Sequence, residues 1–587
     1  MSSFKSFFLV STIVASCAVW SLAQDGSANH PSASEIKQPE KAEPEPADLR
    51  VQPPPTPLSP ASFDAVVDRV IEREHFFLSQ MRKLHPLIET YIQNTRRDQE
   101  LGEVPSSDHY FLGRLEVSNG TGDDSFLGQP GFGSRFLSKL TTLYSLKFLP
   151  LGFAQMVILD SDFQRKYYDF RYVRREFLGQ VRCLVIDVQP KPHSGNGRFV
   201  GRVWVEDQDY NIVRFNGTYA PRPRYSYYLH FDSWRLNLRP GVWLPAYIYS
   251  QETDLKYRGS QTLRFKAQTR LWGYDLQRLA HDEEFTQIVV DEPESVHDQS
   301  ESAQDAAPVQ AQRLWQRQAE ENTLERLQKI GLLAPPGEVD KVLQTVVNNL
   351  EVTNNLDVQP EVRCRVLLTS PLESFTIGHT VVLSRGMVDV LPDEASLAMV
   401  LAHELGHLVL GHEIDTKFAF NDKLFFPDEQ SFQRLDFKQT RADEEAADNK
   451  ALELLKNSPY KDKLSNAGLF MRALQEHAPN LPQLIRPHLG NGLGGNNRLT
   501  NLVATAPALD PKRLDQIAAL PLGGRIKVDP WTDQVELSKA KPVALTSARE
   551  KLEFEITPFF PYLTRLSTGG AEKMAQTSTA PAENQRK

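Results

Sequence analysis

The stretch that most constrains the fold is LAHELGHLVLGH, residues 401–412, because it places imidazoles and a carboxylate inside an apolar, helix-forming run. His403 and His407 are four residues apart, which puts both rings on one side of a helix, one turn apart. Two imidazoles at this spacing can bind one Zn²⁺ ion with bonds of roughly 2.0–2.1 Å. Glu404 is placed to act as the base of an H-E-x-x-H metallopeptidase. The alternative is a pair of histidines packed in a core.

The helix that carries this motif is predicted to begin at Pro392-Asp393 and to run through about Glu413. His412 follows His407 by five residues, and on a continuous helix it would point about 140° away. We therefore expect His412 to be a helix-end histidine and not a metal ligand.

A catalytic zinc ion needs a third protein ligand, and TRADEEAADNKALELL, residues 440–455, predicts a second helix that could supply it. Glu444 and Asp448 lie one turn apart on one face of this helix. Glu444 would complete a site for one Zn²⁺ ion per chain, and Asp448 would accept a hydrogen bond from the other ring nitrogen of His403. Gly406 leaves room for close approach. The alternative is that the acidic residues form only a solvated helix face.

The N-terminal residues 1–23 predict an export signal, with a positive start at Lys5, an apolar run and a cleavage site after Ala23. In one alternative Cys17 is acylated and anchors a lipoprotein, and in another the segment stays as an uncleaved anchor. Residues 24–60 are rich in proline and are predicted to be a linker. No later run approaches the roughly 20 apolar residues of a membrane span. We expect an exported, periplasmic protein without a transmembrane span in its mature chain.

Changes in composition along the rest of the chain predict how it is divided into domains and linkers. We predict a helix plus β-rich domain at 61–290, an acidic linker at 291–312, a zinc metallopeptidase domain at 313–530, a C-terminal extension at 531–566 and a disordered tail at 567–587. A helix beginning at Ser62 has an apolar face that we extend through Ile88. The net charge of −9 argues against non-specific nucleic-acid binding, and three cysteines do not make a disulfide framework.

The β-rich domain is predicted from alternating runs separated by turns, which indicate an antiparallel meander. The runs are 182–188, 201–207, 211–219, 227–234, 242–250 and 261–269. Their aromatic side chains would pack in the core or, alternatively, line an apolar cavity inside a curved sheet. The pattern resembles the LolA/RseB-type fold, an incomplete β-barrel folded around helices. The resulting fold class is α+β, with an antiparallel β-rich domain followed by a mainly helical zincin-type domain that has a small sheet.

The pair HELGH and EEAAD resembles the HtpX-like, CAAX-prenyl-protease-type zinc metallopeptidases, in their soluble, periplasmic, BepA-like branch. The resemblance covers roughly 320–500, and it implies zinc binding by His403, His407 and Glu444, with Glu404 as the base. In that family the two histidines and the glutamate of E-x-x-A-D bind the metal.

Two departures from the family stand out. The family often has Asn-Ala-Phe before its edge strand, and this chain has Glu373-Ser374-Phe375 instead, so the asparagine of that motif is missing. The family also has a His-Pro segment followed by an arginine. The nearest counterparts here are His488 and Arg498, which we expect to approach the site.

These features together predict an exported zinc endopeptidase that hydrolyses unfolded or misassembled envelope proteins. Its polypeptide substrates would include outer-membrane proteins or lipoproteins, and the strand TVVLS, residues 380–384, would pair with an extended substrate. Two alternatives remain open: a chaperone or binding module with a latent protease site, plugged by a loop such as 486–498, and a lipid or lipoprotein carrier.

Overall fold

The computed structural model describes only part of the chain. The described residues are 62–98, 102–117, 121–125, 153, 156–160, 162–220, 229–257, 261–276, 308–412, 436–485, 489–492, 499, 526–528, 535–537, 554, 556 and 558–566. The predicted signal at 1–23, the proline-rich linker at 24–60 and the tail at 567–587 lie outside these residues. Within the described part, no helix combines the length and the apolar character that crossing a membrane requires.

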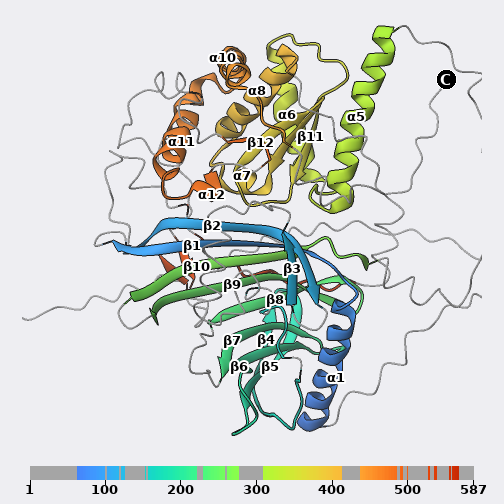
Figure 1. The fold of residues 1–587 in the computed structure, drawn as a ribbon, viewed down its shortest axis with the longest axis vertical. Helices are drawn as coiled ribbons and strands as arrows, with labels where there is room; N and C mark the ends of the chain where they lie inside the picture. Colours follow the sequence, from blue (N-terminus) through green and yellow to red (C-terminus); the bar gives the residue numbers. More distant parts are fainter. Residues whose placement is uncertain are drawn as a thin grey trace, which may run out of the picture. The chain divides into compact units, whose positions relative to one another are not determined.

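The β-rich half forms one antiparallel sheet of ten strands, ordered β3-β2-β1-β10-β9-β8-β7-β6-β5-β4 (Figure 1). The strands are β1 (Leu87–Asp98), β2 (Gly102–Val117), β3 (Thr121–Ser125), β4 (Tyr168–Leu178), β5 (Val181–Pro190), β6 (Arg198–Glu206), β7 (Ile212–Ala220), β8 (Phe231–Arg239), β9 (Val242–Tyr257) and β10 (Gln261–Trp272). The antiparallel meander is confirmed from β5 to β10, and the sequence analysis missed β1 to β4. Strands β3 and β4 are the two edges of this order and do not pair with each other, so the described sheet is not closed.

Helix α1 (Phe63–Met81) begins as predicted, since the Ser62 side chain accepts a hydrogen bond from the backbone of Ala65. Its predicted continuation through Ile88 is wrong. The chain reaches Pro86 five residues after the helix ends, and Ile88 lies in β1, where it pairs with both neighbouring strands. Proline lacks a backbone N–H and disfavours helical geometry in the residue before it, so the apolar spacing of a helix could not persist here.

One face of the sheet buries a large apolar cluster together with α1 and residues between 153 and 163. Phe199, Phe215 and Phe231 stack edge-to-face or tilted within it, with ring centroids 5.7 to 6.2 Å apart. The described aromatic residues of this face therefore pack against each other and against α1, as the core-packing interpretation of the sequence expects.

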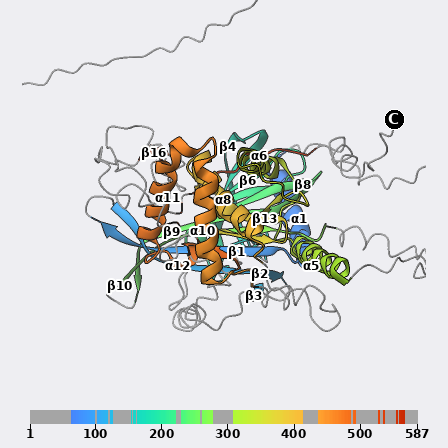
Figure 2. The ribbon, with the colours of Figure 1, turned by 90° about the horizontal axis from the view of Figure 1, so that it is seen from above.

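The second half is mainly helical around a small sheet ordered β11-β13-β12-β14, as predicted in outline (Figures 1 and 2). Its elements are α5 (Pro308–Ile330), α6 (Glu338–Thr353), β11 (Arg363–Leu367), β12 (Glu373–Ile377), β13 (Thr380–Ser384), α7 (Arg385–Val390), α8 (Glu394–Leu410), α10 (Arg441–Lys456), η2 (Lys461–Lys463), α11 (Leu464–His477), α12 (Pro482–Ile485) and β14 (Asn491–Gly492), with a short hairpin of β15 (Ile526–Val528) and β16 (Val535–Leu537). Helix α5 begins inside the segment 291–312 that was expected to be a linker.

Buried carboxylates of the β-rich half bind backbone N–H groups of the helical half. Glu89 in β1 accepts hydrogen bonds from the backbone and hydroxyl of Ser370, at 2.6 and 2.7 Å. Asp108 in β2 accepts hydrogen bonds from the backbone of Gln483 and Leu484, at 3.0 and 2.8 Å. One continuous apolar cluster also includes residues of both halves, and residues 60–587 form one compact unit. The predicted domain boundaries stay a prediction.

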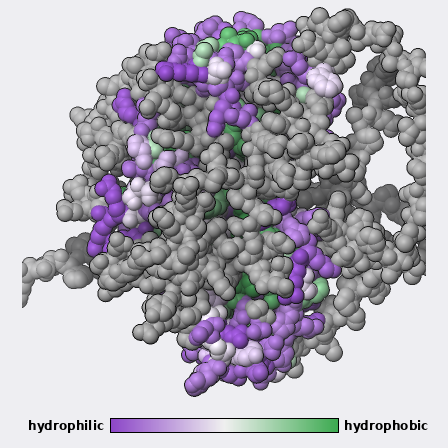
Figure 3. Space-filling view, in the orientation of Figure 1, coloured by the Kyte–Doolittle hydropathy of each residue, from purple (hydrophilic) through white to green (hydrophobic). Residues whose placement is uncertain are grey.

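The described residues 558–566 of the predicted C-terminal extension pack on the β-rich half. The Phe560 ring meets Trp234 at 5.8 Å, and Arg565 forms an ion pair with the buried Glu206 at 2.6 Å. Phe559 and Tyr562 stay more than half exposed. On the face seen in Figure 3, the described surface is mainly hydrophilic.

We expect the contact at Asp108 to make stability depend on pH. Burial raises the pKa of Asp108 to about 6, above its ordinary value of 3.8. The folded state therefore retains a proton that the unfolded state has lost, and this group's contribution to the unfolding free energy falls as pH rises from about 4 to about 6. Two pKa units correspond to at most about 3 kcal/mol. Asp108→Asn should gain stability relative to wild type by up to that amount between pH 4 and pH 7, measured by chemical denaturation. A pH-independent difference between the two proteins would contradict this.

Candidate metal centre

Helix α8 carries the H-E-x-x-H motif. It begins as predicted, where the Asp393 side chain accepts a hydrogen bond from the backbone of Ser396 at 2.8 Å. The predicted continuation through Glu413 is wrong, because α8 ends at Leu410 and Gly411 adopts a left-handed conformation with φ of 70°. The chain therefore turns away from the helix axis directly before His412.

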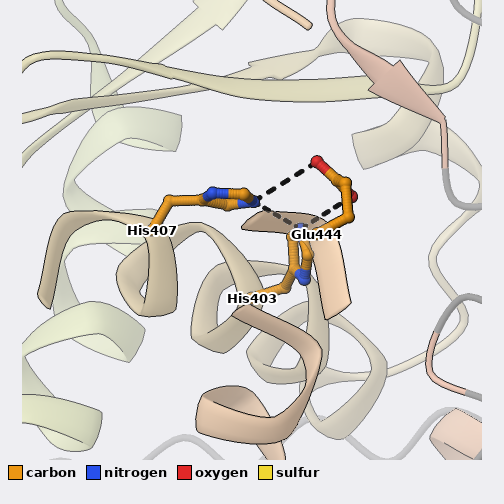
Figure 4. Close-up of side chains that lie close together, drawn as sticks. All are labelled: His403, His407 and Glu444. Carbon is orange, nitrogen blue, oxygen red and sulfur yellow. Dashed lines mark hydrogen bonds and ion pairs between the residues drawn. The ribbon is translucent and has the colours of Figure 1, made fainter. Parts of the chain in front are cut away.

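The structure brings His403, His407 and Glu444 together (Figure 4). The two Nε2 atoms are 3.0 Å apart, and the Glu444 carboxylate oxygens lie 3.5 Å from His403 Nε2 and 3.4 Å from His407 Nε2. Both histidines are almost fully buried, and the Glu444 side chain is 12% exposed. Three nitrogen and oxygen donors therefore converge from two helices on one point.

Close packing of α10 against α8 produces this convergence (Figure 2). A Cβ atom on Gly406 would lie only 2.9 Å from the backbone oxygen of Ala447, so glycine is what allows the two helices to approach, as the sequence predicts. The start of α10 is fixed by Thr440, whose hydroxyl accepts a hydrogen bond from the backbone of Asp443. Glu444 follows within the first turn and faces the histidines.

Asp448 lies behind His403, where the sequence predicts it. Its Oδ1 atom is 2.8 Å from His403 Nδ1, close enough for an ion pair but without hydrogen-bond alignment. Its Oδ2 atom accepts a hydrogen bond from the backbone of Leu499 at 2.8 Å. Asp448 thus connects His403 to a chain segment that follows the two helices.

His412 contacts the site, which the sequence analysis did not expect. Its Nδ1 atom is 2.9 Å from His407 Nδ1, and its Nε2 atom is 3.6 Å from Asp443. The expectation that it points away assumed a continuous helix, whereas the left-handed Gly411 redirects the chain. Burial, followed by the neighbouring His407, lowers the pKa of His412. His412 is outside the group of three metal-ligand candidates and contacts His407 at Nδ1, the ring nitrogen that does not face Glu444.

Glu404 is buried beside the donors, and its Oε1 atom accepts a hydrogen bond of 2.6 Å from Ser374 Oγ in β12. The sequence analysis noted Ser374 only as part of the departure from Asn-Ala-Phe. This departure was the sequence signal for the contact between Ser374 and Glu404, because it places a hydroxyl on the strand next to the motif helix.

The strand next to Glu404 is β12, which corrects the expectation that residues 380–384 pair with a substrate. Those residues form β13, which lies inside the sheet and pairs along its length with β11 and β12. At the outer edge of β12, Glu373 and Ser374 pair with β14. A strand with partners on both sides has no backbone groups left for a peptide, so β13 cannot be the strand that receives one.

The Glu373 carboxylate holds the segment that leads into β14. Its Oε2 atom accepts hydrogen bonds from the backbone of Leu489 and Gly490, at 3.0 and 3.3 Å. The Leu489 carbonyl accepts a further hydrogen bond from the backbone of Phe437, whose ring stacks on Phe375 with centroids 4.6 Å apart. His488 and Arg498, expected near the site, lie outside the described residues.

Comparison with known proteins agrees with this geometry. Residues 338–421 match the model of peptidase family M48. This segment of the helical half is similar to the M48 peptidases. The similarity supports a metallopeptidase, and a peptidase implies polypeptide substrates. Glu444 and Asp448 lie outside the matched residues. A search of the curated proteins found no match.

Two solved structures share similarity with the other part of the chain. A LolA superfamily protein from Nitrosomonas europaea is 10% identical with a TM-score of 0.19, over 36% of this chain and 91% of its own. A domain named for outer membrane lipoprotein sorting, from Vibrio parahaemolyticus, is 12% identical with a TM-score of 0.19, over 35% and 92%.

The donor set fits a zinc ion. Tetrahedral zinc with bonds of about 2.0–2.1 Å has donor atoms about 3.3 Å apart. The separations among His403, His407 and Glu444 are 3.0, 3.4 and 3.5 Å. Two imidazoles and one carboxylate are also a common ligand set of catalytic zinc.

We predict that Glu444→Ala lowers zinc affinity by more than the roughly 10–100-fold that losing an orienting partner costs, because it removes a donor atom. Glu445→Ala is the matched control, since Glu445 pairs with Arg441 and its side chain is 65% exposed. Zinc affinity is measured by competition with a chelator at fixed pH. Loss of zinc in the Glu445 variant alone would show that the wrong glutamate has been assigned.

Proposed function

We propose that this protein is a zinc-dependent endopeptidase in which His403, His407 and Glu444 bind the metal and Glu404 transfers protons. The single observation that supports it best is the convergence of these three donors beside a buried carboxylate, within and next to a segment that matches an M48 peptidase. A core histidine pair would not require a third donor at the spacing of a zinc site.

When bound, zinc would polarise the scissile carbonyl and acidify the attacking water. Glu404 takes the proton of the water and delivers it to the leaving amine. Asp448, at His403 Nδ1, orients that imidazole and favours the tautomer whose Nε2 atom is free to bind metal. His412, whose Nδ1 atom contacts His407 Nδ1, orients the His407 imidazole and favours the same tautomer there.

Substrates are extended polypeptides. An extended chain can pair with a sheet edge through its backbone, which gives affinity with little dependence on sequence. Strand β12 is the candidate edge, because among the described residues only Glu373 and Ser374 of its outer side are paired, and Ser374 bonds directly to Glu404. Weak sequence preference suits the hydrolysis of unfolded or misassembled proteins.

The proposal includes export of the protein. The apolar N-terminal run with Lys5 and the site after Ala23 supports secretion to the periplasm, with acylation at Cys17 as the alternative. Substrates would then be envelope proteins, among them outer-membrane proteins or lipoproteins. Mass spectrometry of the mature N-terminus distinguishes a start at Gln24 from a lipidated Cys17.

The decisive experiment is Glu404→Gln, which keeps the size of the side chain and removes the base. Cleavage of an unfolded test protein should fall by about 10²–10⁴-fold while zinc content and Tm stay near wild type. His403→Ala should lose zinc and activity together. Undiminished cleavage by the zinc-loaded Gln variant would overturn the mechanism.

A latent protease that acts as a binding module is the second candidate, and the pairing of β14 with β12 favours it. This segment takes the outer edge of β12 at Glu373 and Ser374, and Ser374 is the residue that bonds to Glu404. A substrate that needs this part of the edge would first have to displace residues 489–492. The Glu373 carboxylate, which holds Leu489 and Gly490, makes that displacement costly.

Glu373→Gln tests latency. Replacing the carboxylate by an amide weakens two hydrogen bonds to a charged acceptor, each worth about 1.5–3 kcal/mol, and favours release of β14. If β14 blocks substrates, zinc-loaded Glu373→Gln should cleave an unfolded protein about tenfold or more faster than wild type. Glu445→Gln, at an exposed site, should change nothing. An unchanged rate in both variants favours a constitutively open protease.

The carrier alternative rests on the β-rich half. On the face of the sheet that α1 covers, the described aromatic residues pack against one another and against α1. Lipid that co-purifies with the full-length protein and is lost on substitution of Phe199 or Phe231 would favour a carrier.

A further inference from the structure

Ser374 is a polar residue in the sheet whose hydroxyl points at the motif helix. Its Oγ atom lies 2.6 Å from Glu404 Oε1, and the two residues are 0% and 2% exposed. The serine hydroxyl is the donor of this hydrogen bond, and the carboxylate oxygen accepts it. A distance in this range is typical of a charge-assisted hydrogen bond, which is about twice as strong as a neutral one.

The backbone on both sides holds Ser374 in place. Within the sheet it pairs with Leu383 of β13 and Asn491 of β14. The preceding Glu373 donates its backbone N–H to Ser384 and binds the segment at Leu489 through its carboxylate. A donor on such a rigid strand fixes the direction of its acceptor better than a donor on a mobile loop.

We propose that Ser374 is a positioning residue that holds the Glu404 carboxylate by Oε1 and leaves Oε2 for proton transfer. This inference rests on the proposed function of Glu404. A glutamate side chain has three rotatable bonds, and the helix backbone restrains only its start. The bond from Ser374 restrains its end, so that the base meets the water in one orientation.

A small substitution makes the inference testable. Ser374→Ala removes the hydroxyl, keeps the Cβ atom and leaves the backbone pairing of β12 with β13 and β14 intact, so the variant should fold.

The experiment compares Ser374→Ala with Ser396→Ala in the full-length, zinc-loaded protein. Ser396 is a buried serine of α8 whose hydroxyl has no hydrogen-bond partner among the described residues. Ser374→Ala should lower kcat about tenfold or more with KM and zinc content unchanged, because a hydrogen bond to a charged group is lost. Ser396→Ala should leave kcat unchanged.

A second readout does not depend on catalysis. In the metal-free protein, Ser374→Ala should lower the denaturation midpoint, and this loss should shrink in a Glu404→Ala background, since the bonded partner is then absent. If Glu404→Gln abolishes cleavage but Ser374→Ala changes neither kcat nor the midpoint, the positioning role is wrong while the proposed function stands. If Glu404→Gln cleaves normally, the proposed function itself fails.

Discussion

The close contact between α8 and α10 is the constraint on which the candidate metal centre depends. The histidines lie on one helix and Glu444 on the other, so the donors meet only if the two helix backbones approach closely. Gly406 allows that approach, because any larger residue would collide with the backbone at Ala447. The apolar residues of α8 then bury the site, and a buried site excludes the water that would compete for the donors.

Three buried carboxylates around this site accept hydrogen bonds at defined distances. Glu404 accepts from Ser374, Asp448 accepts from Leu499, and Glu373 accepts from Leu489 and Gly490. A buried carboxylate without such donors would carry a large desolvation cost. These bonds therefore offset the burial of charge and, at the same time, bring segments from distant parts of the sequence to the site.

Hydrogen bonds to a buried carboxylate also connect the two halves of the chain. Asp108 of the β-rich half caps α12, and the Leu484 carbonyl of that helix accepts a hydrogen bond from Leu372, next to the strand that reaches Glu404. A few residues after α12 the chain pairs with β12. A physical route of contacts thus runs from the β-rich sheet to the strand beside the candidate base.

The sequence by itself determined the parts of the site that depend on helical spacing. His403, Glu404 and His407 are separated by one helical turn or less, and Glu444 and Asp448 by one turn, so local periodicity predicts which faces they share. The turn-separated apolar runs likewise predicted an antiparallel sheet. Tertiary structure alone decided the contacts between segments: Ser374 with Glu404, β14 with β12, and Glu373 with Leu489. Tertiary structure also decided the position of His412, because one left-handed residue, Gly411, ends the helix and redirects the chain. Spacing along the sequence sets geometry only within a continuous element, and these contacts depend on where elements end and how they pack.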